Sequence, residues 1–285
     1  MKKQKGEKKK IFGRRIVVSL LIICLFVPFA VWQTNSIEIT EFTYANPKIP
    51  ADFEGFKIVQ LSDVHNKSFG KDQSKLLKLI EEARPDVIVI TGDLIDDNTR
   101  NLDSIEALFA GTAAIAPVYY VEGNHDRVPE YYKSVRNIAK QHGVIFLENE
   151  EVTLTRNQSA IKLAGIADPM HFSSEAEYED ALKKLMGQGD EFTILLSHRP
   201  ERIELYEKYG ADVCFTGHAH GGQIALPFIG PVIAPQQGLF PEYTSGMYQS
   251  GDTTMFVNRG LGTVVIPVRL FARPQIVCVT LSART

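Results

Sequence analysis

Two histidines separated by a single residue follow an apolar run, in residues 216–223 with the sequence TGHAHGGQ. Side chains at positions i and i+2 of an extended segment share a face, so His218 and His220 can point the same way. The flanking glycines allow tight turns and close backbone approaches. Imidazole is a common ligand of zinc, iron and manganese ions. The stretch therefore indicates a metal site, and a surface turn that happens to carry two histidines is the alternative.

Four further strand-like apolar segments also end in side chains that bind metal ions. These side chains are Asp63 and His65, Asp93, Asn124 and His125, and His198. Each group alone has an ordinary explanation, such as a helix cap, a turn or a buried histidine. Ligands in open α/β sheets gather at the carboxyl ends of strands. Five segments that all end this way therefore predict one shared metal site.

The set of donor atoms suits two metal ions. Two divalent cations about 3.5–4 Å apart need a bridging oxygen ligand and several terminal nitrogen or oxygen ligands. Two carboxylates, one amide oxygen and four imidazoles supply these, and the mixture favours manganese, iron or zinc over calcium or magnesium alone. The cysteines Cys24, Cys214 and Cys278 suggest neither a disulfide framework nor a thiolate zinc site, and the last two are expected to be small buried apolar residues.

The elements that must position these ligands are short strands and amphipathic helices. Strands are expected at residues 37–44, 56–61, 86–90, 117–121, 144–147, 151–155, 160–166, 192–196, 213–216, 255–257 and 275–281. Helices are expected at residues 73–83, 102–114, 130–141, 174–185 and 200–209. The Pro- and Gly-rich residues 224–246 lack periodicity and are expected to form an ordered loop region. Alternating strands and helices followed by consecutive strands predict an α/β fold with mixed sheets, in one domain over residues 36–285.

The N-terminus has the composition of a membrane segment. Residues 1–15 hold eight Lys or Arg and one Glu, a net charge of +7, so the rest carries −10 of the overall −3. Residues 16–32 are almost wholly apolar, and no clean cleavage site follows, which favours an uncleaved single-pass anchor over a removed signal peptide. Residues 33–35 are expected to be a short tether. The positive-inside rule then places the domain outside the cytoplasm, and its acidic character argues against nucleic acid as a partner.

The ordered motifs resemble those of the calcineurin-like metallophosphoesterases. The matching residues are Asp63-x-His65, Gly92-Asp93, Gly123-Asn124-His125-Asp126, His198 and Gly217-His218-x-His220. The resemblance extends over about residues 56–223, and no ligand position departs from the pattern. The extension at residues 221–223 and the turn at residues 258–262 further resemble the bacterial branch of membrane-associated or exported phosphodiesterases.

This resemblance implies a fold and a division of roles. The fold is two packed mixed β-sheets with helices on their outer faces, a four-layer α/β sandwich. Asp63, His65 and His220 would hold one metal ion, Asn124, His198 and His218 would hold the other, and Asp93 would bridge them. His125 would contact the phosphate and assist the leaving group, and Asp126 would orient the His125 ring. The His-x-His pair would thereby be divided between the two cations.

The function that follows is hydrolysis of a phosphate ester by metal-activated water, with a phosphodiester favoured. Asn66, Arg199 and Arg259 are further candidates for substrate contact, and Asp168 and His171 are minor candidates for a functional role. The anchor and the apolar residues 226–230 suggest a lipid-linked or cell-envelope substrate, although a soluble nucleotide monoester suits the site equally well. A metal-stabilised binding or scaffold protein without turnover is the alternative from another class. The oligomeric state is not predicted.

Overall fold

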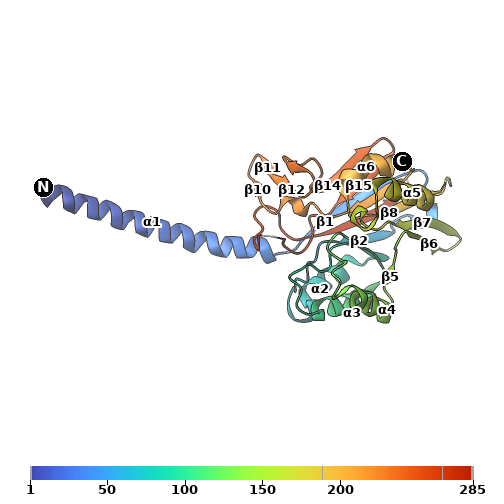
Figure 1. Cartoon of the computed structure of the whole chain (residues 1–285), viewed down its shortest axis with the longest axis horizontal. Helices are drawn as coiled ribbons and strands as arrows, with labels where there is room; N and C mark the ends of the chain where they lie inside the picture. Colours follow the sequence, from blue (N-terminus) through green and yellow to red (C-terminus); the bar gives the residue numbers. More distant parts are fainter. Residues whose placement is uncertain (1, 188, 265, 284–285) are drawn as a thin grey trace.

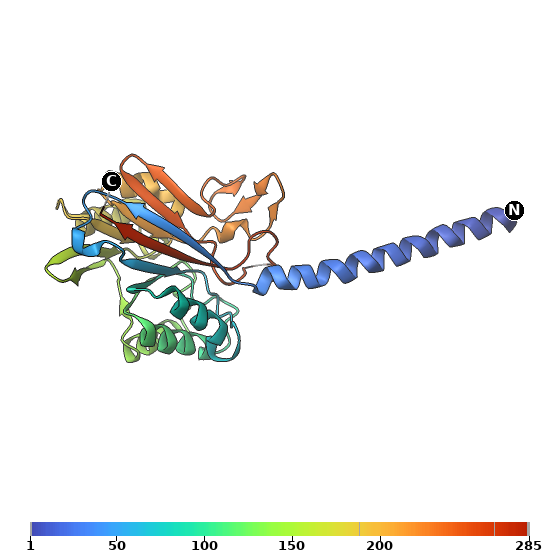
Figure 2. The same cartoon turned by 180° about the vertical axis from the view of Figure 1, so that it is seen from behind.

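The computed structural model describes residues 2–187, 189–264 and 266–283. A long helix, α1 (Lys2–Asn35), extends from one end of a domain that contains every other element (Figures 1 and 2). Of the described helices, one is long and apolar enough to cross a membrane, over Phe12–Asn35, and a signal sequence would meet the same criteria. This agrees with the expected N-terminal membrane segment and leaves open the choice between anchor and signal.

The domain contains two six-stranded mixed sheets. The first has the order β1 (Glu38–Ala45), β16 (Gln275–Ser282), β2 (Lys57–Leu61), β3 (Val87–Thr91), β4 (Val118–Val121) and β5 (Ile145–Phe146). The second has the order β14 (Gly246–Ser250), β15 (Thr253–Val257), β9 (Val213–Thr216), β8 (Thr193–Leu196), β7 (Ser159–Gly165) and β6 (Glu150–Arg156). In the first sheet only β16 and β2 pair antiparallel; in the second the outer pairs β14–β15 and β6–β7 do.

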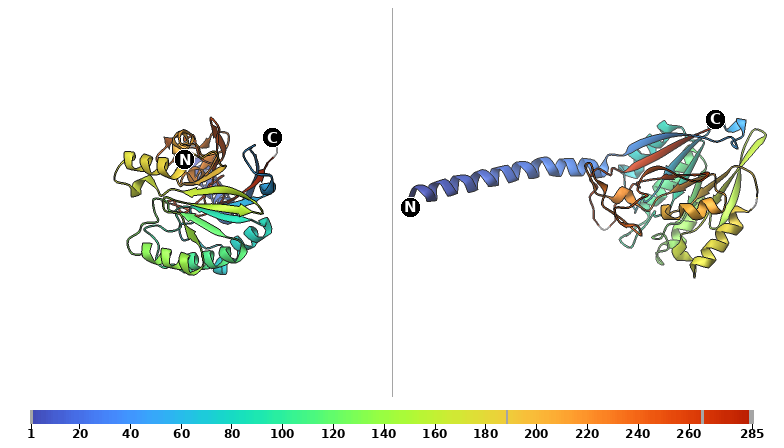
Figure 3. Two further views of the ribbon diagram at one scale, coloured as in Figure 1. Left: turned by 90° about the vertical axis from the view of Figure 1, so that its right-hand side faces the viewer. Right: turned by 90° about the horizontal axis from the view of Figure 1, so that it is seen from above.

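Helices cover the outer face of each sheet, as Figure 3 shows. The first sheet is covered by α2 (Ser74–Ala83), α3 (Asp103–Ile115) and α4 (Tyr132–Gln141), and the second by α5 (Glu175–Met186) and α6 (Ile203–Lys208). Three apolar clusters fill the spaces between these layers. One lies between α2–α4 and the first sheet, one between the two sheets, and one between the second sheet and the helices α5 and α6. The predicted four-layer α/β architecture is confirmed.

The central strands explain why the candidate ligands come together. All residues of β3, β4, β8 and β9 are buried, because each strand has a covered face on both sides. The strands β2, β3 and β4 run parallel in one sheet, and β8 and β9 run parallel in the other. Their carboxyl ends therefore meet along one edge of the sandwich, where polar loop residues can share a site.

Two expectations about irregular segments are wrong. Residues 224–246 are not a loop region alone: they contain the hairpin β10 (Ala225–Leu226) with β11 (Gly230–Pro231), and the hairpin β12 (Ile233–Ala234) with β13 (Gly238–Leu239). The edge strand β14 follows them. Strands of two residues are too short to show an alternating pattern, which is why the sequence did not indicate them.

The second correction concerns residues 33–35, which continue α1 and pack into the domain. Thr34 Oγ1 accepts a hydrogen bond from the backbone N–H of Arg269 at 3.0 Å, and Lys67 Nζ donates to the carbonyl oxygen of Thr34. Gln33 Oε1 accepts from the backbone N–H of Phe271 at 3.1 Å. Both Gln33 and Thr34 are buried. The helix is therefore joined to the domain by its last turn rather than by a flexible tether.

Candidate metal centre

Two buried groups of metal-binding side chains lie at the edge where the strand ends meet. The ligand atoms of Asp63, His65, Asp93 and His220 all lie within 4.8 Å of one another, and so do those of Asp93, His198 and His218. Asp93 belongs to both groups. The two histidines of the His-x-His pair belong to different groups, in agreement with the division that the motif resemblance implied. The buried Asp/His groups are those of a dinuclear metal site.

Asp93 is placed between the groups by its two oxygen atoms. Its Oδ1 accepts a hydrogen bond of 2.8 Å from the backbone N–H of His125. Its Oδ2 lies 3.1 Å from Nε2 of His198 and 3.8 Å from Nε2 of His65, and this buried atom has no hydrogen-bond partner. A carboxylate oxygen that faces one imidazole of each group is suited to bridge two cations.

The other ligands are oriented by contacts outside the centre. His198 Nδ1 lies 2.7 Å from the carbonyl oxygen of Thr91, to which it donates in the tautomer that turns Nε2 toward the centre. That Nε2 lies 3.0 Å from Nδ1 of His218. Asp63 accepts the backbone N–H of His218 at 3.1 Å and has its Oδ1 3.3 Å from Nε2 of His220. The ring nitrogens thus converge on the carboxylates.

Unpaired buried atoms provide a test of whether metal ions fit here. Among the described residues, both ring nitrogens of His65, Oδ2 of Asp93 and Oδ1 of Asn124 are buried without a hydrogen-bond partner. An unsatisfied buried polar group costs about 1–3 kcal/mol, so several in one place need a further partner. All are oxygen or nitrogen donors of the kind that divalent manganese, iron and zinc accept. The residues present therefore fit a pair of such cations.

The electrostatics of the site also favour cations. Although burial opposes ionisation, the charges of His198 and His65 hold the pKa of Asp93 well below its usual value. Burial likewise disfavours a charged His198, yet Asp93 raises its pKa to about 10. Burial lowers the pKa of His65 to about 4 and that of His218 to about 3, which keeps their lone pairs free for a metal. The centre thus offers an ionised Asp93, which attracts positive charge, and neutral imidazoles at His65 and His218, whereas His198 must lose its proton to bind a cation.

His125 lies beside the centre, and its neighbour Asp126 is held by main-chain donors. The half-buried His125 ring packs edge-on against His65, with 5.4 Å between ring centroids. Each oxygen of the Asp126 carboxylate accepts two hydrogen bonds from the main chain. The donors are the backbone N–H groups of Asp93, Leu94, Ile95 and Gly123, at 2.7–3.3 Å. Asp126 thereby ties the loop after β4 to the loop after β3, and its orientation of the His125 ring stays a prediction.

The three candidates for substrate contact have structural partners. Asn66 Nδ2 donates to the carbonyl oxygen of Asn101, and Ser104 donates to its Oδ1. Arg259 forms an ion pair of 3.0 Å with Glu38. Both side chains thus have partners within the protein, and their contact with substrate stays a prediction.

Arg199, the third candidate, is buried and paired with Asp168. Its Nε and one terminal nitrogen donate to the two Asp168 oxygens, the latter at 2.9 Å. Burial opposes the ionisation of Asp168, but the hydrogen bonds and charge of Arg199 hold its pKa below the usual value. The other terminal nitrogen lies 2.8 Å from Nε2 of His218. Arg199 and Asp168 therefore support the His218 ring, and the minor candidate His171 lies 2.9 Å from the carbonyl oxygen of Gly123.

Two supporting residues have no signal in the sequence. Gln236 Oε1 lies within hydrogen-bond distance of Nε2 of His218, the nitrogen that Arg199 also faces; in the tautomer that donates from Nε2 to Gln236, the lone pair of Nδ1 is directed to the centre. Arg269 is fully buried and donates to the carbonyl oxygens of Arg259, His220, Gly262 and Ala272. Both lie in a Pro- and Gly-rich tail without periodicity, and only the folded chain brings them to the ligands.

Two glycines allow the loops to approach the carboxylates. A Cβ atom at Gly217 would lie 1.9 Å from Oγ of Ser62 and 2.4 Å from Oδ2 of Asp63, and one at Gly123 would lie 2.2 Å from Oδ1 of Asp93. These distances are far shorter than an ordinary van der Waals contact. The glycines of the motifs are therefore required for the close approach of backbone and ligand.

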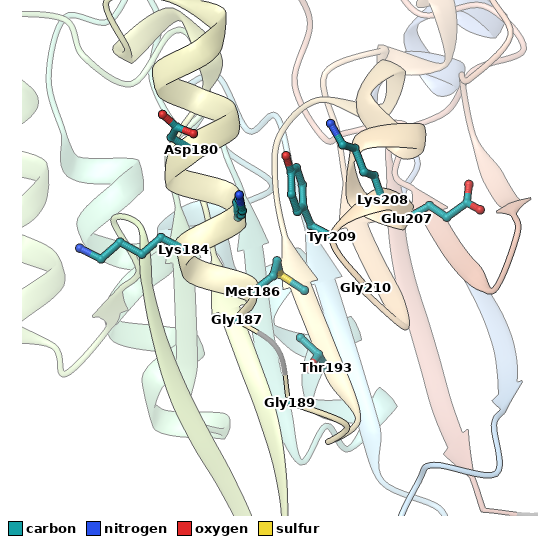
Figure 4. A pocket seen from close by; sticks show the side chains of 11 residues that line it. Asp180, Lys184, Met186, Gly187, Gly189, Thr193, Glu207, Lys208, Tyr209 and Gly210 are labelled. Carbon is teal, nitrogen blue, oxygen red and sulfur yellow. The ribbon is translucent and has the colours of Figure 1, made fainter.

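The pockets of the described surface differ in their relation to this centre. One of about 820 Å³ lies between α5 and the end of α6, lined by residues such as Lys184, Lys208 and Tyr209 (Figure 4). No ligand residue lines it. A second pocket, of about 410 Å³, is lined in part by Ala219 and His220 and so adjoins the centre directly.

With the geometry established, comparison with known proteins identifies the class. The family model of the calcineurin-like phosphoesterases matches residues 56–222, which contain every ligand residue described above. The chain belongs to this family. It is accordingly a metal-dependent hydrolase of phosphoester bonds.

Several bacterial proteins are similar over most of their length. An uncharacterised metallophosphoesterase of Bacillus subtilis, YkuE, is 36% identical over 256 residues, which cover 88% of this chain and 87% of the relative. The phosphodiesterase YaeI of Escherichia coli is 26% identical, with 78% of this chain and 80% of the relative covered. The UDP-2,3-diacylglucosamine pyrophosphatase LpxG of Chlamydia trachomatis is also 26% identical, with 86% and 92% covered.

Proposed function

We propose that the protein is a dinuclear-metal phosphodiesterase that acts at the outer face of a membrane. The observation that carries the proposal is the buried, unpaired Oδ2 of Asp93, which faces His65 on one side and His198 on the other. In this arrangement one carboxylate oxygen could coordinate both cations. The names of YaeI and LpxG, a phosphodiesterase and a pyrophosphatase, support a substrate with two groups on its phosphate.

Each ligand residue has a defined task in this proposal. Asp63, His65 and His220 would hold one cation, Asn124, His198 and His218 would hold the other, and Asp93 would be shared between them. When bound, the two cations neutralise phosphate oxygens and lower the pKa of water. Manganese, iron and zinc suit the mixed oxygen and nitrogen donors.

The chain's own residues then position the substrate and the proton. The half-buried ring of His125 stands beside the centre, where it can contact a phosphate oxygen and donate a proton to the departing alcohol. Its backbone N–H holds Asp93, so the ring and the bridging carboxylate keep a fixed separation. Asp126 fixes the loop that carries His125 through four main-chain hydrogen bonds.

Hydrolysis of chromogenic esters tests the activity. The purified full chain is loaded with Mn²⁺, Zn²⁺, Fe²⁺ or Ni²⁺ and given bis-p-nitrophenyl phosphate or p-nitrophenyl phosphate. We expect hydrolysis that EDTA abolishes, with the higher kcat/KM for the diester. A higher kcat/KM for the monoester would favour a phosphomonoesterase, and no hydrolysis with any metal would favour the scaffold alternative.

The location is proposed from the charge of the leader. Residues 1–15 carry a net charge of +7 and precede an apolar helix, which by the positive-inside rule leaves the domain outside.

Because the two cysteines of the domain are buried, a cysteine introduced at the exposed Lys78 gives a clean label site. A membrane-impermeant maleimide should label Lys78→Cys in intact cells, and Lys5→Cys only after lysis. The reverse pattern would contradict the proposal.

A further inference from the structure

The pocket of about 410 Å³ beside the metal centre has apolar walls. It is lined by Ala219 and His220 at the centre and by Ile224, Ile233, Val264 and Ile266 farther out. His220 is the single ionisable residue among its described lining residues. The Nε2 of His220 faces Asp63, which does not line the pocket. A phosphate at the metal centre would therefore have an apolar space directly next to it.

The surface around this pocket is also apolar. Residues 224–240, which form the two hairpins, contain no Asp, Glu, Lys, Arg or His. Eleven large apolar residues outside α1 are exposed in the described part of the domain, and eight of them lie in residues 226–240 and 266–271. These eight are Leu226, Phe228, Ile229, Ile233, Leu239, Phe240, Ile266 and Phe271. Such a concentration marks an interaction surface, because soluble surfaces spread apolar residues singly.

The membrane helix fixes where this surface lies. The hairpins stand at the end of the domain from which α1 leaves, in Figures 1 and 2 and in the right-hand view of Figure 3. Residues 269–273, which follow the pocket residue Ile266 in the chain, pack against α1. Phe29 and Phe271 have ring centroids 5.6 Å apart, and the Arg273 guanidinium lies 5.0 Å from the centre of the Trp32 ring. The backbone N–H of Arg269 donates to Thr34 Oγ1. A bilayer crossed by α1 would therefore meet the apolar surface and the mouth of the pocket.

We propose that this pocket is an acyl-chain subsite, which takes a long hydrocarbon chain of a phosphodiester lipid while the phosphate lies at the metal centre. The inference rests on the proposed phosphodiesterase function and adds the substrate class. The occupant is a lipid chain rather than a protein partner because the pocket is lined by the proposed metal ligand His220 and by residues of the hairpins, which stand at the end of the domain from which α1 leaves. An apolar cavity of a few hundred Å³ is of the size that small ligands occupy.

A matched pair of soluble substrates tests the subsite. p-Nitrophenyl dodecyl phosphate and p-nitrophenyl methyl phosphate have the same leaving group and differ only in the chain. The metal-loaded full chain in nanodiscs is assayed below the critical micelle concentration. Each methylene that leaves water contributes roughly fourfold to binding, so we expect kcat/KM for the dodecyl ester to exceed that for the methyl ester by at least about tenfold.

Wall variants separate the pocket from partition of the substrate into the bilayer. Ile233→Asp and Ile266→Asp place a charge on the half-exposed wall, whereas Met247→Asp changes an equally exposed apolar residue on β14 outside the pocket. We expect the dodecyl-to-methyl ratio to fall about tenfold in the two wall variants and to stay at the wild-type value in Met247→Asp. Dodecyl phosphate should likewise inhibit Met247→Asp far more strongly than it inhibits Ile233→Asp and Ile266→Asp.

The outcomes distinguish the two proposals. Equal rates on both esters in the wild type would overturn the subsite and leave the phosphodiesterase intact. A chain preference that persists in both wall variants would overturn the placement of the chain in this pocket. Loss of a stable dimer in Ile233→Asp, with an unchanged ratio, would show that a second copy covers this surface. Failure to hydrolyse either ester with any metal would instead overturn the phosphodiesterase.

Discussion

The buried guanidinium of Arg269 donates a hydrogen bond of 3.1 Å to the carbonyl oxygen of His220, so a residue from the C-terminal tail holds the loop that carries a candidate ligand. The same guanidinium donates to three further carbonyl oxygens, of Gly262, Arg259 and Ala272. Burial lowers the pKa of Arg269 to about 9, and no carboxylate pairs with it in the described structure. Its charge is solvated by main-chain carbonyls and by Nδ1 of His220, which lies 3.4 Å from a terminal nitrogen.

Arg269→Met should destabilise the protein strongly. Four buried carbonyl oxygens lose a charged donor, and each such loss costs about 1–3 kcal/mol, so the free energy of unfolding should fall by roughly 3 kcal/mol or more. Arg202→Met is the matched control, because its ion pair with Glu175 is exposed and should contribute at most about 1 kcal/mol. Thermal unfolding of the metal-free proteins measures both. Equal shifts of Tm would contradict the role of Arg269.

Asp93→Ala and His125→Ala should both lower phosphodiester turnover by orders of magnitude, but for different reasons. Asp93→Ala removes the shared oxygen, so bound metal measured by mass spectrometry should fall to one ion per chain or fewer. His125→Ala leaves every proposed ligand in place and should retain two ions while kcat falls about 10²–10⁴-fold. Turnover near the wild-type rate in a metal-loaded His125→Ala protein would refute the proton-transfer role.

The Asp168–Arg199 pair predicts a pH-dependent contribution to stability. Burial opposes ionisation of Asp168, but Arg199 holds its pKa below the ordinary 3.8. A depressed carboxyl pKa adds stability that is fully present above the unfolded-state pKa and is lost as pH falls through the folded-state value. The stability difference between wild type and Asp168→Asn should therefore be about 3 kcal/mol at neutral pH and shrink below about pH 4. Urea unfolding across pH 3–7 checks this, and a constant difference would contradict it.

The packing of α1 predicts that the mature protein keeps its N-terminal segment. Cleavage after residue 34 would remove both Trp32 and Thr34, which contact Arg273, Lys67 and Arg269. We expect the intact mass of protein extracted from membranes to include residues from the leader, and alkaline carbonate not to release it. A chain that starts after residue 30 would show instead that the segment is a signal peptide.

The positions of the ligands could be predicted because they depend on local patterns. Each follows a short apolar run, and such runs form buried parallel strands whose ends coincide. For Asp93 and His198, the sequence therefore indicated the site without any knowledge of packing. Strand bounds agree with the structure to within a residue or two for the same reason, as at β3 and β8.

What the sequence could not predict depends on contacts between distant residues. Arg269 reaches His220 across 49 positions, and Gln236 reaches His218 through a hairpin too short to show a pattern. The role of Asp126 depends on where neighbouring main-chain donors point. The polar residues after Trp32 resembled a tether, yet they continue the helix because the Thr34 side chain bonds the Ala30 carbonyl and its surroundings bury it.

The loop after β4 concentrates three different tasks in three consecutive residues. Asn124 carries a buried, unpaired amide oxygen, His125 places its ring against His65, and Asp126 fastens the loop to its neighbour. A one-residue insertion or deletion here would misplace all three at once, whereas the hairpins over residues 225–239 contact the described ligands through a single side-chain pair, Gln236 with His218. A hairpin can therefore change in length without moving the ligands if Gln236 keeps its place, while the register of residues 123–126 cannot change.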